Sequence, residues 1–182
     1  QGFTRCEQCK GQIPIQGVAP MSLQACPACS CLYFVPFDLE GWLIFRPLGS
    51  GGMGHVYLAI SLQDSNAMAC AKILRRSGEV GNEAMEALLF EGELTQALGP
   101  HPNIIHVHSF GRLGENAAYL LMDYVHGPTF LDKIQSHAKG IHPEECIYYM
   151  LDIVDALEHV EQCGYIHRDL NPSNIVLREE RS

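Results

Sequence analysis

Short stretches in which apolar and polar residues alternate occupy the middle of the chain. They run over residues 43–48, 55–60 and 68–74, and each has the two-residue period of a β-strand. A glycine-rich stretch separates the first two, and the polar residues 63–67 separate the second from the third. Connections this short join antiparallel neighbours, so we expect three antiparallel strands here.

Two longer segments have the spacing of amphipathic helices. Residues 82–99 carry apolar side chains on one side and end at Gly99. Residues 142–164 have Pro143 and two glutamates near their start, as helix N-termini prefer, and carry an apolar stripe of Ile147, Met150, Leu151, Val154 and Leu157. Two more strand-like stretches, 105–111 and 117–125, lie between these helices. The pattern predicts an α+β fold in which five strands and one helix precede a helical part.

The N-terminal residues have a different texture, rich in cysteine, glycine and proline. Cys6 and Cys9 form one Cys-x-x-Cys pair, and Cys26 and Cys29 form another. Two such turns can direct four thiolates at one tetrahedral zinc ion, and so short a stretch cannot bury a core without a metal. We therefore predict a four-cysteine zinc knuckle, with Cys31 as a possible substitute ligand. The alternative is four free thiols on a loop, in which case neither a metal nor an apolar core would stabilise the segment.

Charge and composition exclude some functions. The 182 residues carry a formal net charge of −9, which is the wrong sign for a general nucleic-acid binder. No apolar run approaches the roughly 20 residues that a membrane-spanning helix needs. The chain lacks the basic and apolar start of a signal peptide, and its paired cysteines suit a metal site better than disulfides. We expect a cytoplasmic protein with no membrane segment in this chain.

Two features of the strand region suggest phosphate chemistry. Gly49, Gly51 and Gly54 form a G-x-G-x-x-G frame, but a strand-like stretch follows it, whereas dinucleotide-binding folds have a helix there. A glycine hairpin fits better, and an ordinary turn is the alternative. Lys72 is a single charge in an apolar strand, so it either reaches solvent or meets a carboxylate from the next helix, where Glu91 and Glu93 are the candidates.

The last residues gather polar side chains in a loop after the long helix. Asp169 could accept a proton from a hydroxyl group, and Asn174 could give an oxygen to magnesium. Arg168 adds a permanent cation. A base, a metal ligand and cations are what phosphoryl transfer requires, although a surface loop could hold any one of them by accident.

Residues from Trp42 onward resemble the protein kinase family. The resemblance rests on five motifs in the family order, which are LGSGGMGHVY, ACAKIL, HPNII, YLLMDYVHG and YIHRDLNPSNIVL. The amino-acid sequence of the glycine-rich motif is similar to that of bacterial-type serine/threonine kinases. Together with the cysteine pattern, the resemblance divides the chain into a zinc knuckle at 1–34, a linker at 35–41 and a kinase domain at 42–182. The kinase domain would have a small lobe to about residue 126 and the start of a large lobe from 127.

The resemblance also implies roles for individual residues. Lys72 would hold the ATP phosphates and pair with Glu91, Asp169 would be the catalytic base, and Asn174 a magnesium ligand. Met122 would be the gatekeeper of the adenine pocket. The phosphates would lie under Gly49, Ser50, Gly51, Gly52 and Gly54, and adenine against Leu48, Val56, Cys70, Met122, Asp123, Val125 and Leu177.

Two departures from the family pattern affect the expected activity. Asn171 stands where serine/threonine members usually have lysine, and the chain contains no Asp-Phe-Gly. We expect a fragment of a serine/threonine kinase that uses ATP and Mg²⁺ on protein hydroxyls, inactive by itself, with the zinc knuckle available to a protein partner. The alternatives are a pseudokinase scaffold and a small-molecule phosphotransferase.

Overall fold

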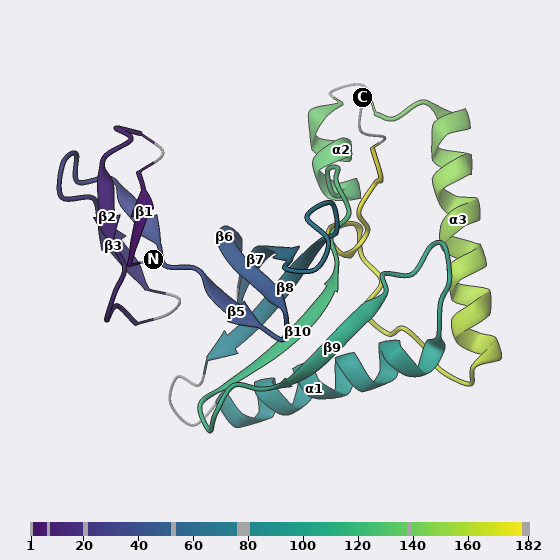
Figure 1. Ribbon diagram of the computed structural model, residues 1–182. Helices are drawn as coiled ribbons and strands as arrows, with labels where there is room; N and C mark the ends of the chain where they lie inside the picture. Colours follow the sequence, from purple (N-terminus) through teal and green to yellow (C-terminus); the bar gives the residue numbers. More distant parts are fainter. Residues whose placement is uncertain are drawn as a thin grey trace.

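The computed structural model describes residues 2–6, 8–19, 22–51, 54–75, 81–137 and 140–179. A six-stranded antiparallel sheet lies at the centre of the molecule (Figure 1). Its spatial order is β5 (Phe37–Leu39), β6 (Trp42–Gly51), β7 (Gly54–Ser61), β8 (Met68–Arg75), β10 (Ala117–Asp123) and β9 (Val107–Arg112). The predicted α+β class and the three consecutive antiparallel strands β6, β7 and β8 are confirmed.

The sheet has one strand more than predicted, because β5 forms inside the segment expected to be a linker at 35–41. Leu39 pairs with Trp42 across a two-residue turn. Both turn residues have positive φ, 51° at Glu40 and 83° at Gly41, and the Asp38 carboxylate accepts the Gly41 N–H at 2.8 Å. Such a turn matches the twist of paired strands. Glutamate is uncommon in this conformation, so the sequence carried little signal for the hairpin.

Each face of the sheet has its own apolar core. On one face, Ala69, Ala71 and Ile73 of β8 are buried with Tyr57 of β7. On the other face, helix α1 (Gly81–Leu98) covers β8, β9 and β10 (Figure 1) with a buried set that consists of Leu74, Met85, Leu88, Val107, Ala118 and Leu120. The predicted helix at 82–99 is confirmed.

Gly92 has a packing role in this second core. A β-carbon at Gly92 would lie 2.5 Å from Cγ of Phe110 on β9, too close for any side chain. The residue that weakens the helix by propensity therefore lets α1 approach the sheet.

The N-terminal module consists of two small hairpins, and the end of the second contacts the main sheet. Strands β1 (Phe3–Arg5) and β2 (Gln12–Pro14) form the first hairpin, and β3 (Leu23–Ala25) and β4 (Leu32–Phe34) form the second. At the end of β4, Phe34 joins the core of the main sheet and stacks on Tyr57, with ring centroids 5.1 Å apart. The module and the sheet therefore share buried surface.

The C-terminal part is helical, with α2 (Phe130–Ser136), α3 (Pro143–Gln162) and the short 3₁₀ helix η1 (Pro172–Asn174). Helix α3 confirms the predicted helix at 142–164, and His159 on it contacts the carbonyl oxygen of Leu98 at 2.8 Å. The predicted apolar stripe is largely uncovered, with Leu151 60% and Val154 58% exposed. Within the described residues, no helix combines the length and apolar character needed to cross a bilayer.

Candidate functional site

The strand β8 presents Lys72 to helix α1. Because Ala71 and Ile73 point into the first core, Lys72 points to the opposite face of the sheet. Its Nζ lies 2.8 Å from Oε2 of Glu91 on α1. Glu93 is exposed. The predicted pairing of Lys72 with Glu91 rather than Glu93 is therefore confirmed.

Other residues predicted to contact the nucleotide share the face that bears Lys72. Val56 lies directly opposite Lys72 in the β7–β8 ladder, and Met122 lies opposite Cys70 in the β8–β10 ladder. Residues directly opposite on antiparallel strands have side chains on the same face, as do residues two apart on one strand. Val56, Cys70, Lys72 and Met122 thus line one surface of the sheet.

The glycine-rich segment forms the tip of the β6–β7 hairpin. Gly49 pairs with Val56, and Gly51 pairs with Gly54. The hairpin confirms the strand–turn–strand interpretation over a dinucleotide-binding fold. Gly52 lies outside the described residues, and of Ser50 and Gly51 only the backbone pairing is described. Leu48, just before this tip, is 41% exposed.

The segment between β10 and α2 is held against the residues that follow η1. The N–H of Leu177 donates to the carbonyl of Pro128 at 2.9 Å, and that of Glu179 donates to the carbonyl of His126 at 2.8 Å. Gly127 between them has φ of 146°, and a β-carbon there would lie 1.8 Å from the Leu177 carbonyl oxygen. Only glycine permits this approach, which holds Leu177 beside the segment that contains Val125.

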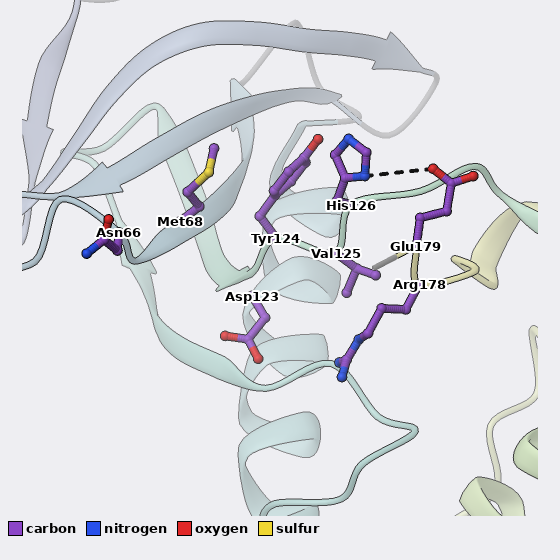
Figure 2. A pocket seen from close by; sticks show the side chains of 8 residues that line it. All are labelled: Asn66, Met68, Asp123, Tyr124, Val125, His126, Arg178 and Glu179. Atoms are coloured by element: carbon purple, nitrogen blue, oxygen red, sulfur yellow. Dashed lines mark ion pairs between the residues drawn. The ribbon is translucent and has the colours of Figure 1, made fainter. Parts of the chain in front are cut away.

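A pocket of about 280 Å³ lies beside the same segment (Figure 2). His126 and Glu179 form a loose pair across it, with Nδ1 and Oε2 3.8 Å apart. Its full lining is Asn66, Met68, Asp123, Tyr124, Val125, His126, Arg178 and Glu179. Of the predicted adenine contacts only Asp123 and Val125 line this pocket, and Lys72 does not.

A strained turn positions Asp169. Arg168 has φ of 62°, and the N–H of Asp169 donates to the carbonyl of His167 at 2.8 Å. A hydrogen bond between residues two apart around a positive φ is the rare form of γ-turn, and it directs the chain sharply at Asp169.

Two carboxamides hold the Asp169 carboxylate. Asn174 donates from Nδ2 to Oδ2 at 3.0 Å, and Asn171 donates from Nδ2 to Oδ1 at 3.3 Å. Both amides also donate to the Asp169 carbonyl, at 3.0 and 3.1 Å. Asn171 in turn accepts the Ser173 N–H at 3.0 Å, which caps η1. Sequence reasoning treated Asn171 only as a missing cation and did not find this contact.

The N-terminal module brings five thiols together. Sγ of Cys6 lies 3.6 Å from that of Cys29 and 3.0 Å from that of Cys31, and Sγ of Cys9 lies 3.6 Å from that of Cys26. A separation of about 3.6 Å suits two thiolates on one tetrahedral ion with Zn–S bonds of about 2.3 Å. The four sulfurs that lie within 4.8 Å of one another include Cys31 instead of the predicted Cys9.

The two Cys-x-x-Cys turns nevertheless have the same backbone conformation and hydrogen bonds. Lys10 and Ser30 have φ of 61° and 59°, and each donates its N–H to the carbonyl of the first cysteine of its turn. The N–H of Gly11 donates to the Cys9 sulfur and that of Cys31 to the Cys29 sulfur. Cys31 therefore occupies the place that Gly11 has in the first turn.

Hydrogen bonds favour the thiolate form of the first cysteine in each turn. The Cys31 thiol, followed by the Cys9 backbone N–H, lowers the pKa of Cys6 to about 6. The Ala28 backbone N–H lowers the pKa of Cys26.

Comparisons with known proteins agree with the geometry. Residues 42–182 match the family described as protein kinase domain. The serine/threonine-protein kinase PrkC of Bacillus subtilis is 34% identical over 134 residues, which cover 74% of this chain and 20% of PrkC. The crystal structure of the Mycobacterium tuberculosis PknI kinase domain superposes with a TM-score of 0.65 at 28% identity, covering 78% of this chain and 57% of that one.

A third relative is similar over a longer stretch. The serine/threonine-protein kinase PknG of Mycolicibacterium smegmatis is 30% identical over 169 residues, covering 86% of this chain and 21% of PknG. This share exceeds the segment 42–182, so the alignment extends into the residues that precede it. The chain spans only about a fifth of the length of these two full-length kinases.

Proposed function

Because the chain belongs to the protein kinase family, we propose that it is part of a serine/threonine kinase that transfers the γ-phosphate of ATP to protein hydroxyls. The observation that supports this most is the Lys72–Glu91 ion pair on the same sheet face as Val56, Cys70 and Met122. A cation fixed by a carboxylate on an otherwise apolar face suits a nucleotide that has both a flat base and charged phosphates.

The chain's own residues divide the work in this proposal. Glu91 orients the Lys72 ammonium toward the α- and β-phosphates, and the β6–β7 hairpin covers them with backbone N–H groups. Asp169, held by its two carboxamides, accepts the proton of the attacking hydroxyl. The carboxamide oxygen of Asn174 is available to magnesium, which when bound offsets the negative charge of the phosphates.

Phosphotransfer from radiolabelled ATP to a generic acceptor protein tests the proposal. We expect a signal from a protein with a complete kinase domain and none from its Asp169→Asn variant. The 182 residues alone should give no signal, because they contain no Asp-Phe-Gly to hold the principal magnesium ion. A folded, complete protein without activity would favour the alternative of a pseudokinase scaffold. The feature that suggests this alternative is Asn171, which takes the place of an expected lysine.

We also propose that the N-terminal module binds one zinc ion through Cys6, Cys9, Cys26 and Cys29. The equivalent backbone of the two turns supports this set, although Cys31 is near enough to compete. Elemental analysis should find about one zinc per chain. Cys9→Ser should lower the zinc content and Cys31→Ser should leave it unchanged, whereas the reverse result would assign the fourth position to Cys31.

Two further expectations belong to this proposal. Phe3, Leu23 and Leu32 expose apolar side chains on the module, which supports contact with a protein partner. All eight cysteines are free thiols, which supports a cytoplasmic location. Crosslinking with and without the substitutions Leu23→Glu and Leu32→Glu tests the first, and cell fractionation tests the second.

A further inference from the structure

The side chain of Cys70 makes one contact that the proposed reaction does not require. Its Sγ lies 3.5 Å from the carbonyl oxygen of Asp123 and donates to it. The N–H of Asp123 is used on the other side of the strand, where it donates to the carbonyl of His106 at 2.9 Å. The 3.5 Å contact places the Asp123 carbonyl oxygen beside the side chain of Cys70, which lies two residues from Lys72 on the same sheet face.

This carbonyl has a part in the proposed nucleotide site. In that site the Asp123 carbonyl would accept a hydrogen bond from the 6-amino group of adenine. The 6-oxo group of hypoxanthine or guanine has no such hydrogen and would turn its lone pairs toward the carbonyl. A site that offers only an acceptor at this point therefore rejects 6-oxopurines.

We infer that Cys70 determines base specificity by adding a donor beside the Asp123 carbonyl, so that the site accepts 6-oxopurine nucleotides as well as ATP. The inference rests on the proposed function, because it takes the face that bears Lys72 as the nucleotide site. The S–H bond can rotate from the carbonyl oxygen to a 6-oxo oxygen placed beside it. With adenine bound, the thiol instead competes with the 6-amino group for the same carbonyl.

The environment of Cys70 keeps the proton that this role needs. Burial, followed by the nearby Asp123, raises the pKa of the Cys70 thiol to about 11. The group is therefore a neutral donor at physiological pH. A thiolate would be an acceptor only and would repel the 6-oxo oxygen.

Competition binding with three substitutions separates the donor from the size of the side chain. ATP and ITP, which differ at the 6-position, would displace a fluorescent ATP analogue from the purified chain. Cys70→Ala removes donor and bulk, Cys70→Val removes the donor but keeps bulk, and Cys70→Ser keeps a donor. Loss of one neutral hydrogen bond corresponds to roughly a 3- to 10-fold change in affinity.

We expect Cys70→Ala and Cys70→Val each to raise the preference for ATP over ITP by roughly 3- to 10-fold, and Cys70→Ser to stay within about twofold of the unsubstituted chain. Cys146→Ala on α3 is the matched control and should change neither affinity. An unchanged preference in Cys70→Ala, or opposite shifts in the alanine and valine variants, would overturn the inference. If these variants still bind ATP, the proposed nucleotide site itself remains supported. Binding of neither nucleotide would contradict the proposed function as well.

Discussion

The Asp169 carboxylate is oriented by neutral side chains. Asn171 stands where the resemblance to the kinase family implied a lysine, and its carboxamide donates to both the side chain and the backbone of Asp169. The loop therefore keeps the hydrogen bonds that orient the base but places no extra cation near the transferred phosphate.

Replacing Asn171 by alanine should impair the chemical step more than nucleotide binding. In a protein with a complete kinase domain we expect kcat to fall roughly 10- to 100-fold with KM for ATP changed less than about twofold, because one donor to a charged group is lost. Steady-state kinetics measures both values. Asn66→Ala, at the turn before β8, is the control and should leave kcat intact. An equal loss in KM, or no loss in kcat, would mean that Asn171 does not position Asp169.

Residue-level features were predictable where strand or helix periodicity determines them. Alternation along β8 predicts that Lys72 meets a carboxylate of the next helix, whereas the choice of Glu91 over Glu93 came from the resemblance to the kinase family. Cys31 could be named in advance only as a substitute ligand, and the contacts of Asn171 were not foreseen, because both depend on tight turns around Ser30 and Arg168, which have positive φ. No periodic pattern specifies such turns.

Among the elements, helix α1 depends on the absence of a side chain at Gly92. Gly92→Ala should gain about 1 kcal/mol of helix propensity. The same substitution should cost more stability than this, roughly 1–3 kcal/mol, because the new methyl group clashes with the base of the Phe110 ring. We therefore expect a net fall in the free energy of unfolding, measured by urea denaturation.

A double-mutant cycle identifies the cause of this loss. In a Phe110→Ala background the ring is gone, so the cost of Gly92→Ala should shrink by about 1 kcal/mol or more. An unchanged cost would place the strain elsewhere than in the contact between α1 and β9.

The N-terminus of α2 gives a pH-dependent contribution to stability. Thr129 and Asp132 form a capping box, and the Thr129 hydroxyl, with the Thr129 backbone N–H, lowers the pKa of Asp132 below its ordinary 3.8. Because the pKa of Asp132 is lower in the folded chain, its carboxylate contributes fully to folding stability above pH 3.8. This contribution is lost as the pH falls through the lowered pKa. Asp132→Ala should therefore destabilise the helix at pH 6 and progressively less as the pH falls below 3.8, followed by circular dichroism. A difference that persists undiminished in strong acid would contradict the assignment.

Long elements were predictable and short ones were not. The five strands and two helices with clear periods lie within a few residues of their expected bounds. Strand β5 has three residues, too few to show alternation, and forms only because β6 offers it an edge. The bridge between Thr129 and Val176 likewise joins segments far apart in sequence, which local patterns cannot reveal.

At the scale of the whole molecule, the exposed face of α3 should cause self-association of the 182-residue chain. Ile147, Leu151 and Val154 are all more than half exposed on this face. We expect the sedimentation coefficient to rise with protein concentration, and the double substitution Leu151→Lys and Val154→Lys to abolish that rise. Phe90→Lys, on the exposed side of α1, is the control and should leave the association intact. Equal suppression by both would exclude α3 as the contact.

The stacking of Phe34 on Tyr57 makes the N-terminal module and the kinase sheet one thermodynamic system. A ligand that binds only the folded module stabilises everything that unfolds with it, by an amount that grows with the logarithm of the free zinc concentration. The melting temperature of the small lobe should therefore rise as zinc is added and fall with a chelator. Phe34→Ala should keep the zinc content and lose this dependence, whereas equal melting of the unsubstituted chain with and without zinc would show that the two parts unfold separately. Through one aromatic side chain, the availability of a metal ion would set how much of the population has a folded nucleotide-binding lobe.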